Sequence, residues 1–494
     1  MITLLTIPFI VFQHCVTGSP SSDNQRFSVE PNLIKNRFEE WLDPRCPIDL
    51  DEKKQIYRNQ RCTLTRHESD FVPLQHMKDE VGHNNERFPL LTYHCRDDEI
   101  TFVAIGNAGI PGFAKFNRDK KRVSDNINPI HGQIGKDVSR ISKKHGAHFA
   151  LLVGNNFYDG VENVEDPQWE TVWAKRFNVK ELDIPFFVVN GNRERMKNNT
   201  ATGCYSVHGA HEKHWILPDL AYSVDVLNDV GGFRMLFTET EIEADEIIYG
   251  ESKWKKERLA KSHWTSDSIS RRGTSPYLHE QQHMSPDIAW IKYQQELYKS
   301  LRTRKVPHAI MVGYRHLYSA LEGHTKRFVT NHEVGTYIAN DYVQNGKVTT
   351  LSREVMYDCY ISGDVAGLEY FKANDNREYF GVGGGGGEIV NDTVGSTATI
   401  WKWLRSKWST CMEGKSQVGK VEHGVEYAKR AYGFAVFKYQ WKANKKKVMY
   451  YEYAKKGSTY KLREDPKTIE SAIYDERDAK KIKSRMGHEA RRKK

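Results

Sequence analysis

Five short apolar segments, each followed within two residues by a glycine, constrain the fold of this chain most strongly. They are Ile100–Ile105, Phe149–Val153, Phe186–Val189, Ala309–Val312 and Tyr357–Ile361. Their length and composition are typical of buried strands. After the first of them, Ile134, Val138 and Ile141 recur at helical spacing. Strands that alternate with helices predict an α/β sheet with crossover connections, in which ligands bind where strands end in loops.

The rest of the chain divides into regions of different character. Residues 1–18 contain a short apolar run before small residues, and we expect a secretory signal peptide there. Residues 19–97 are expected to be a cysteine-containing extension that packs on a main domain at 98–463, and residues 464–494 a basic, charged tail. No later stretch is apolar for the roughly 18 residues that a transmembrane helix needs, so no membrane anchor is expected.

Three segments of the main domain carry expectations of their own. Gly433–Phe437 and Val448–Tyr453 are predicted to form a closing hairpin. Residues 383–387 are consecutive glycines, which indicate either a flexible turn or a close approach of the backbone to other groups. Residues 241–284 are charged and rich in serine, so we expect a surface insertion.

Cysteines and sequons agree with a secretory chain. Six cysteines remain once Cys15 leaves with the signal peptide, namely Cys46, Cys62, Cys95, Cys204, Cys359 and Cys411. An even number is compatible with disulfides, although the sequence leaves their pairing open. Asn198 and Asn391 lie in glycosylation sequons. We therefore expect a glycoprotein that is secreted or resides in the lumen of the secretory pathway.

The formal net charge is +10, which favours acidic partners or reflects basic groups in exposed loops and the tail. The tail itself is either a solvated end or a contact for anionic lipid or an acidic partner. We expect a protein partner, whose identity the sequence does not give, and no nucleic acid.

The five strand ends carry motifs that resemble those of dinuclear metallophosphoesterases. In order they are Gly106-Asn107-Ala108-Gly109, Gly154-Asn155-Asn156-Phe157-Tyr158, Gly191-Asn192-Arg193-Glu194, Gly313-Tyr314-Arg315-His316 and Gly363-Asp364-Val365-Ala366. Over residues 98–463 their order and spacing are similar to the purple, tartrate-resistant acid phosphatase branch of the calcineurin-like metallophosphoesterases. This resemblance implies a four-layer α/β/β/α sandwich with a cleft at the strand ends.

The resemblance also implies a two-metal site, from which this chain departs. The metal-ligand positions of the family correspond to Asn107, Asn155, Tyr158, Asn192, Tyr314, Asp364 and Ala366. Only Tyr158 and Asn192 match the ligands that the family uses, and the catalytic histidine position is Arg193. An amide offers a neutral acceptor and a guanidinium cannot ligate a metal. We therefore expect neither a metal cofactor nor a catalytic residue.

Three explanations remain open. The favoured one is a catalytically inactive pseudophosphatase kept for binding or scaffolding, similar in kind to the glideosome-associated phosphatase-like anchor of apicomplexan parasites. The second is an active phosphomonoester hydrolase whose altered site holds one or two divalent or ferric ions, with ligands drawn from Asp364, Glu194, Tyr158 and His316. The third is a mistaken motif alignment. Arg193 is expected to pair with Glu194 or Asp364, or to hold an anionic ligand bidentately.

Overall fold

A computed structural model of the chain describes residues 55–66, 72–73, 87–88, 90–111, 130–194, 197, 201–218, 222–238, 240, 308–314, 316, 341–344, 347–350, 357–364, 367–373, 377–387, 423–457 and 459–473. The expectations for the signal peptide, the 241–284 insertion, both sequon asparagines, Cys46, Cys411 and Ala366 lie outside these residues. Within the described ranges, no helix has the length and apolar character needed to cross a membrane.

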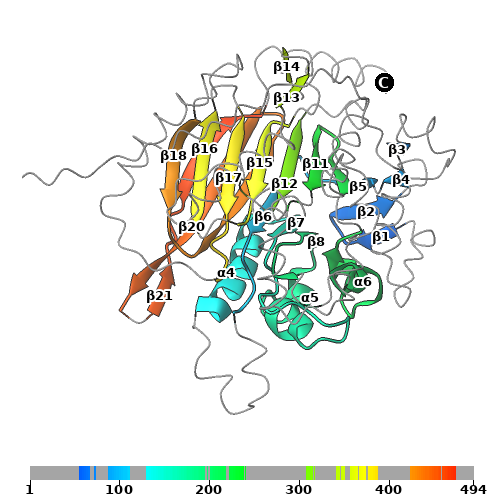
Figure 1. Ribbon diagram of the computed structural model, residues 1–494, viewed down its shortest axis with the longest axis vertical. Coiled ribbons are helices and arrows are strands. Elements are labelled where there is room, and N and C mark those ends of the chain that lie inside the picture. Colours follow the sequence, from blue (N-terminus) through cyan, green and yellow to red (C-terminus); the bar gives the residue numbers. More distant parts are fainter. Residues whose placement is uncertain are drawn as a thin grey trace, which may run out of the picture.

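Two large sheets form the body of the molecule (Figure 1). The ten-stranded sheet has the order β1-β2-β5-β10-β11-β12-β15-β17-β16-β18. Its strands are β1 (Gln55–Arg58), β2 (Cys62–Arg66), β5 (Leu90–Cys95), β10 (Tyr222–Leu227), β11 (Gly232–Thr238), β12 (Ala309–Gly313), β15 (Cys359–Ser362), β16 (Leu368–Ala373), β17 (Glu378–Val382) and β18 (His423–Lys429).

The eight-stranded sheet has the order β21-β20-β19-β6-β7-β8-β9, with β22 also paired to β20. Its strands are β6 (Glu99–Ile105), β7 (Phe149–Val153), β8 (Phe186–Val189), β9 (Trp215–Ile216), β19 (Gly433–Gln440), β20 (Lys445–Lys456), β21 (Thr459–Leu462) and β22 (Lys467–Ala472). Two small hairpin pairs stand apart, β3 (Val72–Pro73) with β4 (Arg87–Phe88) and β13 (Asp341–Gln344) with β14 (Lys347–Thr350). The five apolar segments and the closing hairpin are therefore strands, as predicted.

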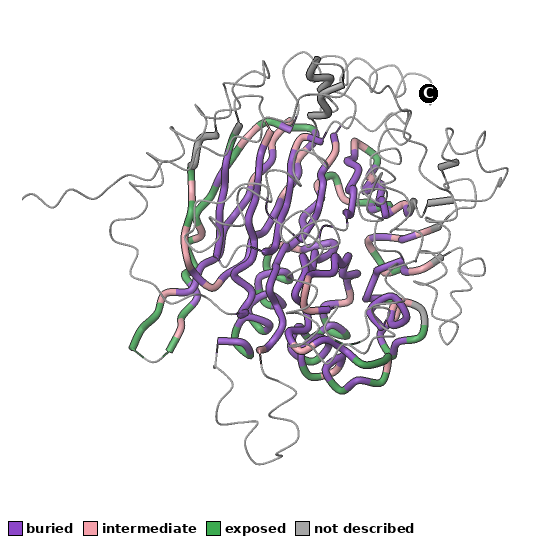
Figure 2. The backbone as a smooth tube through the Cα atoms, in the orientation of Figure 1, coloured by how far each residue is buried: buried purple, intermediate pink, exposed green. Residues whose placement is uncertain are grey.

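The core lies between the two sheets, where aromatic side chains of one sheet meet those of the other. Ring centroids are 5.1 Å apart for Phe380 and Phe437 and 5.9 Å apart for Phe187 and Phe237. Both sheets are buried through most of their width (Figure 2). Aromatic pairs of this kind contribute area burial and edge or stacking attraction, so they fix how the sheets face each other.

Helices flank the eight-stranded sheet. They are α4 (Ile130–His145), α5 (Val179–Leu182) and α6 (Ala201–His208), with a π-helical turn η2 (Trp169–Ala174) and a 3₁₀ turn η4 (Glu212–His214). Ile134, Val138 and Ile141 are buried where α4 contacts β6 and β19. Their helical spacing therefore predicted which face of α4 packs on the sheet. The α/β/β part of the expected sandwich is thus present, and no helix of the described residues forms a layer over the ten-stranded sheet.

Strands are present on both sides of the expected main domain. The extension before residue 98 adds β1, β2 and β5 to the ten-stranded sheet, because Leu91, Tyr93 and Cys95 alternate into the core and β5 pairs in parallel with β10. After residue 464, β22 pairs with β20 and buries Ile469 against it. Both features follow from short alternating apolar patterns within polar surroundings.

Candidate functional site

The first three motifs meet at one edge of the eight-stranded sheet. Strand β6 is parallel to β7 and β7 to β8, so their carboxyl ends point the same way. Asn107 and Asn155 immediately follow the glycines that end β6 and β7, and both have left-handed backbones, with φ of 53° and 52°. Asparagine and aspartate are the non-glycine residues that most readily adopt this conformation. An asparagine at these positions therefore keeps the turn and removes the negative charge that an aspartate would bring.

The fourth and fifth motifs approach the same edge from the other sheet. The amides of Gly363 and Asp364 donate to the Tyr314 carbonyl at 3.0 and 2.8 Å, which joins the ends of β12 and β15. A Cβ at Gly363 would lie only 1.7 Å from the Val153 carbonyl oxygen, so glycine is required where the two sheets come closest. The described residues of all five motifs thus lie at the same edge of the two sheets.

Asn155 is the centre of a buried network of neutral groups. Its Nδ2 donates to Asn107 Oδ1 at 3.0 Å and to the Tyr314 hydroxyl, and its Oδ1 accepts from the Arg193 amide at 3.0 Å. The Tyr314 hydroxyl donates in turn to Asn192 Oδ1 at 3.3 Å. Both donor hydrogens of the Asn155 amide and its oxygen therefore have partners.

The orientation of the Asn155 amide follows from chemistry. The Arg193 backbone N–H can only donate, so the group that faces it must be Oδ1. The NH₂ group then faces Asn107 and Tyr314, toward the centre of the five motifs. At this position the chain presents protons instead of lone pairs, and protons cannot bind a cation.

Glu194, the last residue of the third motif, holds the second motif in place. Its carboxylate accepts from the backbone amides of Gly191 at 2.6 Å, Asn155 at 3.1 Å, Phe157 at 2.9 Å and Asn156. The side chain has no exposed surface; burial raises its pKa, while the amide donors lower it. These amides take up the carboxylate of Glu194, which was one of the partners considered for Arg193.

The role of Tyr314 was not visible in the sequence. Its ring packs against bare backbone, since a Cβ at Gly154 would lie 2.1 Å from the ring, and the side chain is 2% exposed. A phenol at this position, where the resemblance implies a histidine, therefore fills space and offers a hydroxyl in place of an imidazole. The sequence feature that could have indicated this role is the glycine of the second motif, because its missing side chain leaves room for the ring.

The glycine run makes a close backbone approach, which settles the alternative left open by the sequence. The amides of Gly385 and Gly387 donate to the carbonyls of Gly106 and Asn107 at 2.9 and 2.8 Å. Arg176, which is buried, donates to Gly385 O at 3.1 Å, to His131 O at 2.6 Å and to Ala108 O. Burial lowers the pKa of Arg176 to about 10. The first motif, the start of α4 and the glycine run are thereby tied together.

The remaining candidate residues lie around this network. The guanidinium of Arg193 lies 5.2 Å from the centroid of the Tyr158 ring, which is buried. His316 Nδ1 lies 3.2 Å from Asp364 Oδ2, and both side chains are buried. Asp364 therefore has an imidazole partner.

These residues do not fit a pair of metal ions. A two-metal centre needs a negatively charged bridging ligand and several further carboxylates or imidazoles. At the bridging position Asn155 is neutral and turns its NH₂ group inward, and Tyr314 fills the place of an imidazole. Asp364 and His316, two of the ligands considered for an altered site, are directed at one another.

Comparison with known proteins gives distant relatives over part of the chain. Tartrate-resistant acid phosphatase type 5 of Oryctolagus cuniculus is 32% identical over 126 residues, which are 25% of this chain and 34% of that protein. The Mus musculus protein of the same name is 28% identical over 138 residues, 27% of this chain and 38% of that protein. The chain thus spans little more than a third of these relatives. Over that stretch it is a distant relative of the tartrate-resistant acid phosphatases, as its motifs predicted.

Among solved structures, GAP50, the anchor in the inner membrane complex of Plasmodium, is 17% identical with a TM-score of 0.44, and the match covers 78% of this chain and 94% of that chain. Purple acid phosphatase PPD1 from yellow lupin (Lupinus luteus) seeds is 14% identical with a TM-score of 0.41, covering 80% of this chain and 57% of that chain. No protein-family model matches the chain.

Proposed function

We propose that this chain is a phosphatase-like protein of the secretory pathway that does not hydrolyse phosphate esters and acts by binding or scaffolding. One observation carries the proposal: at the meeting point of the five motifs, amide and phenol groups bond directly to one another. Asn155 contacts Asn107 at 3.0 Å and Tyr314, and Tyr314 contacts Asn192 at 3.3 Å. Such a satisfied neutral network stabilises the fold at the point where catalysis would need charge.

The location in the secretory pathway rests on different support. Cys62 and Cys95 form a disulfide, and Cys204 is disulfide-bonded as well. Disulfides persist in oxidising compartments and are rare in the cytosol. The apolar run at residues 1–18 and the sequons at Asn198 and Asn391 point the same way.

The test is metal content together with activity. Protein purified from a eukaryotic secretory host should contain far less than one iron, zinc or manganese per chain by mass spectrometry of the elements. It should show no purple tyrosinate-to-iron absorption and no hydrolysis of p-nitrophenyl phosphate. Two equivalents of metal per chain with phosphatase activity would sink the proposal, and one equivalent would favour the altered hydrolase.

A further inference from the structure

The hairpin formed by β20 and β21 projects beyond the body of the two sheets and presents a row of cations (Figure 1). Among the described strands, β21 pairs only with β20, so it is an edge strand. Lys456, Lys461 and Arg463 are exposed on this hairpin, and Lys429 at the end of β18 is half-exposed beside it. These four residues are called the basic row.

Strand alternation places the three hairpin cations on one face. Lys461 lies opposite Ala454, and the Arg463 amide donates to the Glu452 carbonyl at 2.9 Å, so the pairing of the two chains continues past the end of β21. Lys461 and Arg463 are two residues apart, which puts their side chains on the same face with Cα atoms about 7 Å apart. Lys456 is a diagonal neighbour of Lys461 on that face, at roughly 7–8 Å.

One buried carboxylate lies beneath the row. Glu452 is 2.6 Å from Lys429 Nζ and 2.9 Å from Arg463 Nη1, and it accepts from the Tyr427 hydroxyl at 3.2 Å. Its single negative charge balances only one of these two cations. In the described part of the chain, no carboxylate pairs with either hairpin lysine. The four cations of the row and this one carboxylate therefore leave an excess of positive charge on an exposed face.

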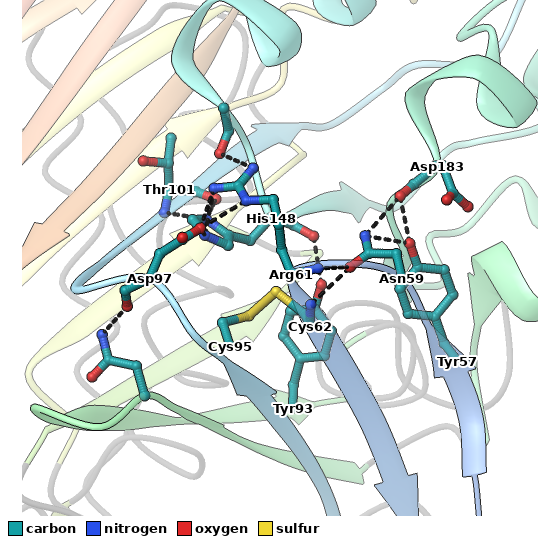
Figure 3. The surroundings of a disulfide bond; sticks show 12 residues. Tyr57, Asn59, Arg61, Cys62, Tyr93, Cys95, Asp97, Thr101, His148 and Asp183 are labelled. Carbon is teal, nitrogen blue, oxygen red and sulfur yellow. Dashed lines mark hydrogen bonds and ion pairs between the residues drawn. A yellow bond between two sulfur atoms is a disulfide. The ribbon is translucent and has the colours of Figure 1, made fainter.

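Cations outside the row are balanced by acidic partners of their own. Arg61, beside the disulfide that joins β2 and β5, lies 2.5 Å from Asp97 (Figure 3). Glu464, which follows the last cation of the row in the sequence, pairs instead with Arg140 of α4 at 2.8 Å. The positive excess is therefore local to the basic row.

The hairpin backbone is fixed before any ligand arrives. Leu462 is buried, and the ring of Tyr460 makes an edge contact with Tyr432, with centroids 5.1 Å apart. These side chains lie on the face opposite to the cations, because Leu462 neighbours Lys461 in the strand. Binding then orders only the ends of the cationic side chains, which lowers the entropic cost of association.

We propose that the basic row binds a sulfated polysaccharide chain. A local positive excess attracts polyanions, and a guanidinium can hold an oxyanion through two parallel N–H donors. Cations that follow one another in steps of roughly 7 Å along a hairpin match a linear polymer with repeated anionic groups. A bilayer would instead need cations spread over a plane. The choice of a sulfated glycan over nucleic acid rests on the secretory location proposed above.

Lysines on an edge strand also have a purely structural use, because they prevent pairing with the edge of another molecule. The two uses respond differently to the sign of the charge. A glutamate in place of Lys456 or Lys461 would still block edge pairing, since a charge of either sign is costly to bury. It would repel a polyanion, so charge reversal separates the two uses.

The experiment titrates the full chain with a heparin octasaccharide by calorimetry, at low and at physiological salt. We expect saturable binding that weakens as salt rises, because a polyanion releases counterions on binding, and little binding of a desulfated octasaccharide. K456E/K461E should weaken binding at least about 10-fold, since two attractive charge contacts become repulsive. The matched control is K180E/K213E, at exposed positions of α5 and η4, which changes the net charge equally and should weaken binding at most about 2-fold.

The inference is overturned if K456E/K461E, folded by circular dichroism, binds the octasaccharide like wild type. Equal losses in K456E/K461E and K180E/K213E would also overturn it, because net charge alone would then explain binding. If the reversal variant does not fold, K456Q/K461Q takes its place, with an expected loss of about 3-fold. Tighter binding of polyglutamate or of phosphatidylserine vesicles would identify a peptide or lipid partner and sink the assignment. Metal content and phosphatase activity do not involve these lysines, so failure here leaves the proposed function untouched.

Discussion

The same two strands, β6 and β7, carry opposite chemistry at their two ends. At the carboxyl ends, Asn107 and Asn155 enter a network of neutral amides and a phenol. At the amino ends, Asp97 and His148 join a guanidinium and two sulfur atoms. Topology places the ligand site of an α/β sheet at the carboxyl ends, yet there the central contacts are between neutral groups, whereas charged side chains and a disulfide meet at the amino ends. Position in a fold therefore predicts where a site lies, and donor atoms decide what it binds.

The largest effect should come from restoring metal ligands at the carboxyl-end site, which is the five-motif network at the carboxyl ends of β6 and β7. The full set is Asn107 and Asn155 to Asp, Val365 to Asp, and Arg193, Tyr314, Asp364 and Ala366 to His. Zinc or manganese affinity should rise from undetectable to tight, because ligand charge and number return together. Phosphatase activity should remain weak, since the groups that orient the new histidines are absent. Calorimetric titration and p-nitrophenyl phosphate hydrolysis measure both.

The matched control is the N107D/N155D double variant. It should bind metal hardly better than wild type, because two carboxylates leave each ion short of ligands and groups that act as a unit are not additive. Indistinguishable titrations of the full set and wild type, both well folded, would mean that these positions do not share a metal site.

The next effect concerns Glu194, which organises the carboxyl-end site. E194A removes the acceptor of four buried backbone amides, of which those of Gly191 and Phe157 lie within 2.9 Å of the carboxylate. Each unsatisfied amide costs roughly 1–3 kcal/mol, so the free energy of unfolding should fall by at least about 3 kcal/mol. Urea denaturation measures it. E165Q, at an exposed position, should change it by less than about 0.5 kcal/mol.

Lowering the pH should reveal a third effect on stability, which originates at the start of α4. Burial, and then the neighbouring Arg176, lower the pKa of His131 to about 3, below its ordinary value of 6.5. The unfolded chain therefore takes up a proton between these values, and stability falls by about 1.4 kcal/mol for each pH unit below 6.5. Above pH 6.5 the imidazole is neutral in both states and has no effect.

Other buried histidines steepen the same curve, so the comparison must be between variants. H131Q should flatten the fall in unfolding free energy between pH 6.5 and 5, measured by denaturation at each pH. H208Q, at an exposed position, should leave the curve unchanged. A curve for H131Q parallel to that of wild type would show that this imidazole is not held neutral.

The smallest effect concerns the surface. Asn198 lies shortly after the third motif, and we expect it to carry a glycan when the chain passes through the secretory pathway. Glycosidase treatment of secreted protein should increase its gel mobility, and N198Q should remove part of that shift, with N391Q removing the remainder. Unchanged mobility after treatment would contradict both sites.

Local patterns predicted much of the fold. The apolar segments before the motif glycines and the helical period of Ile134, Val138 and Ile141 are short-range signals, and each produced the expected element. The extension was harder, because β1, β2 and β5 are short strands in polar surroundings, and β5 joins them to the sheet through β10, which lies more than a hundred residues away. Long-range pairing of this kind leaves little trace in a local window.

The sequence by itself determined the charge and donor type at each motif position, because residue identity fixes both. Only the tertiary structure decided which of these groups contact one another. The inward NH₂ of Asn155 depends on the Arg193 amide, and the place of the Tyr314 ring depends on the bare backbone of Gly154. The closeness of His148 to Cys62 and Cys95 was likewise decided by strand order. Contacts between side chains distant in sequence arise only when sheets pack, so composition and spacing could not give them.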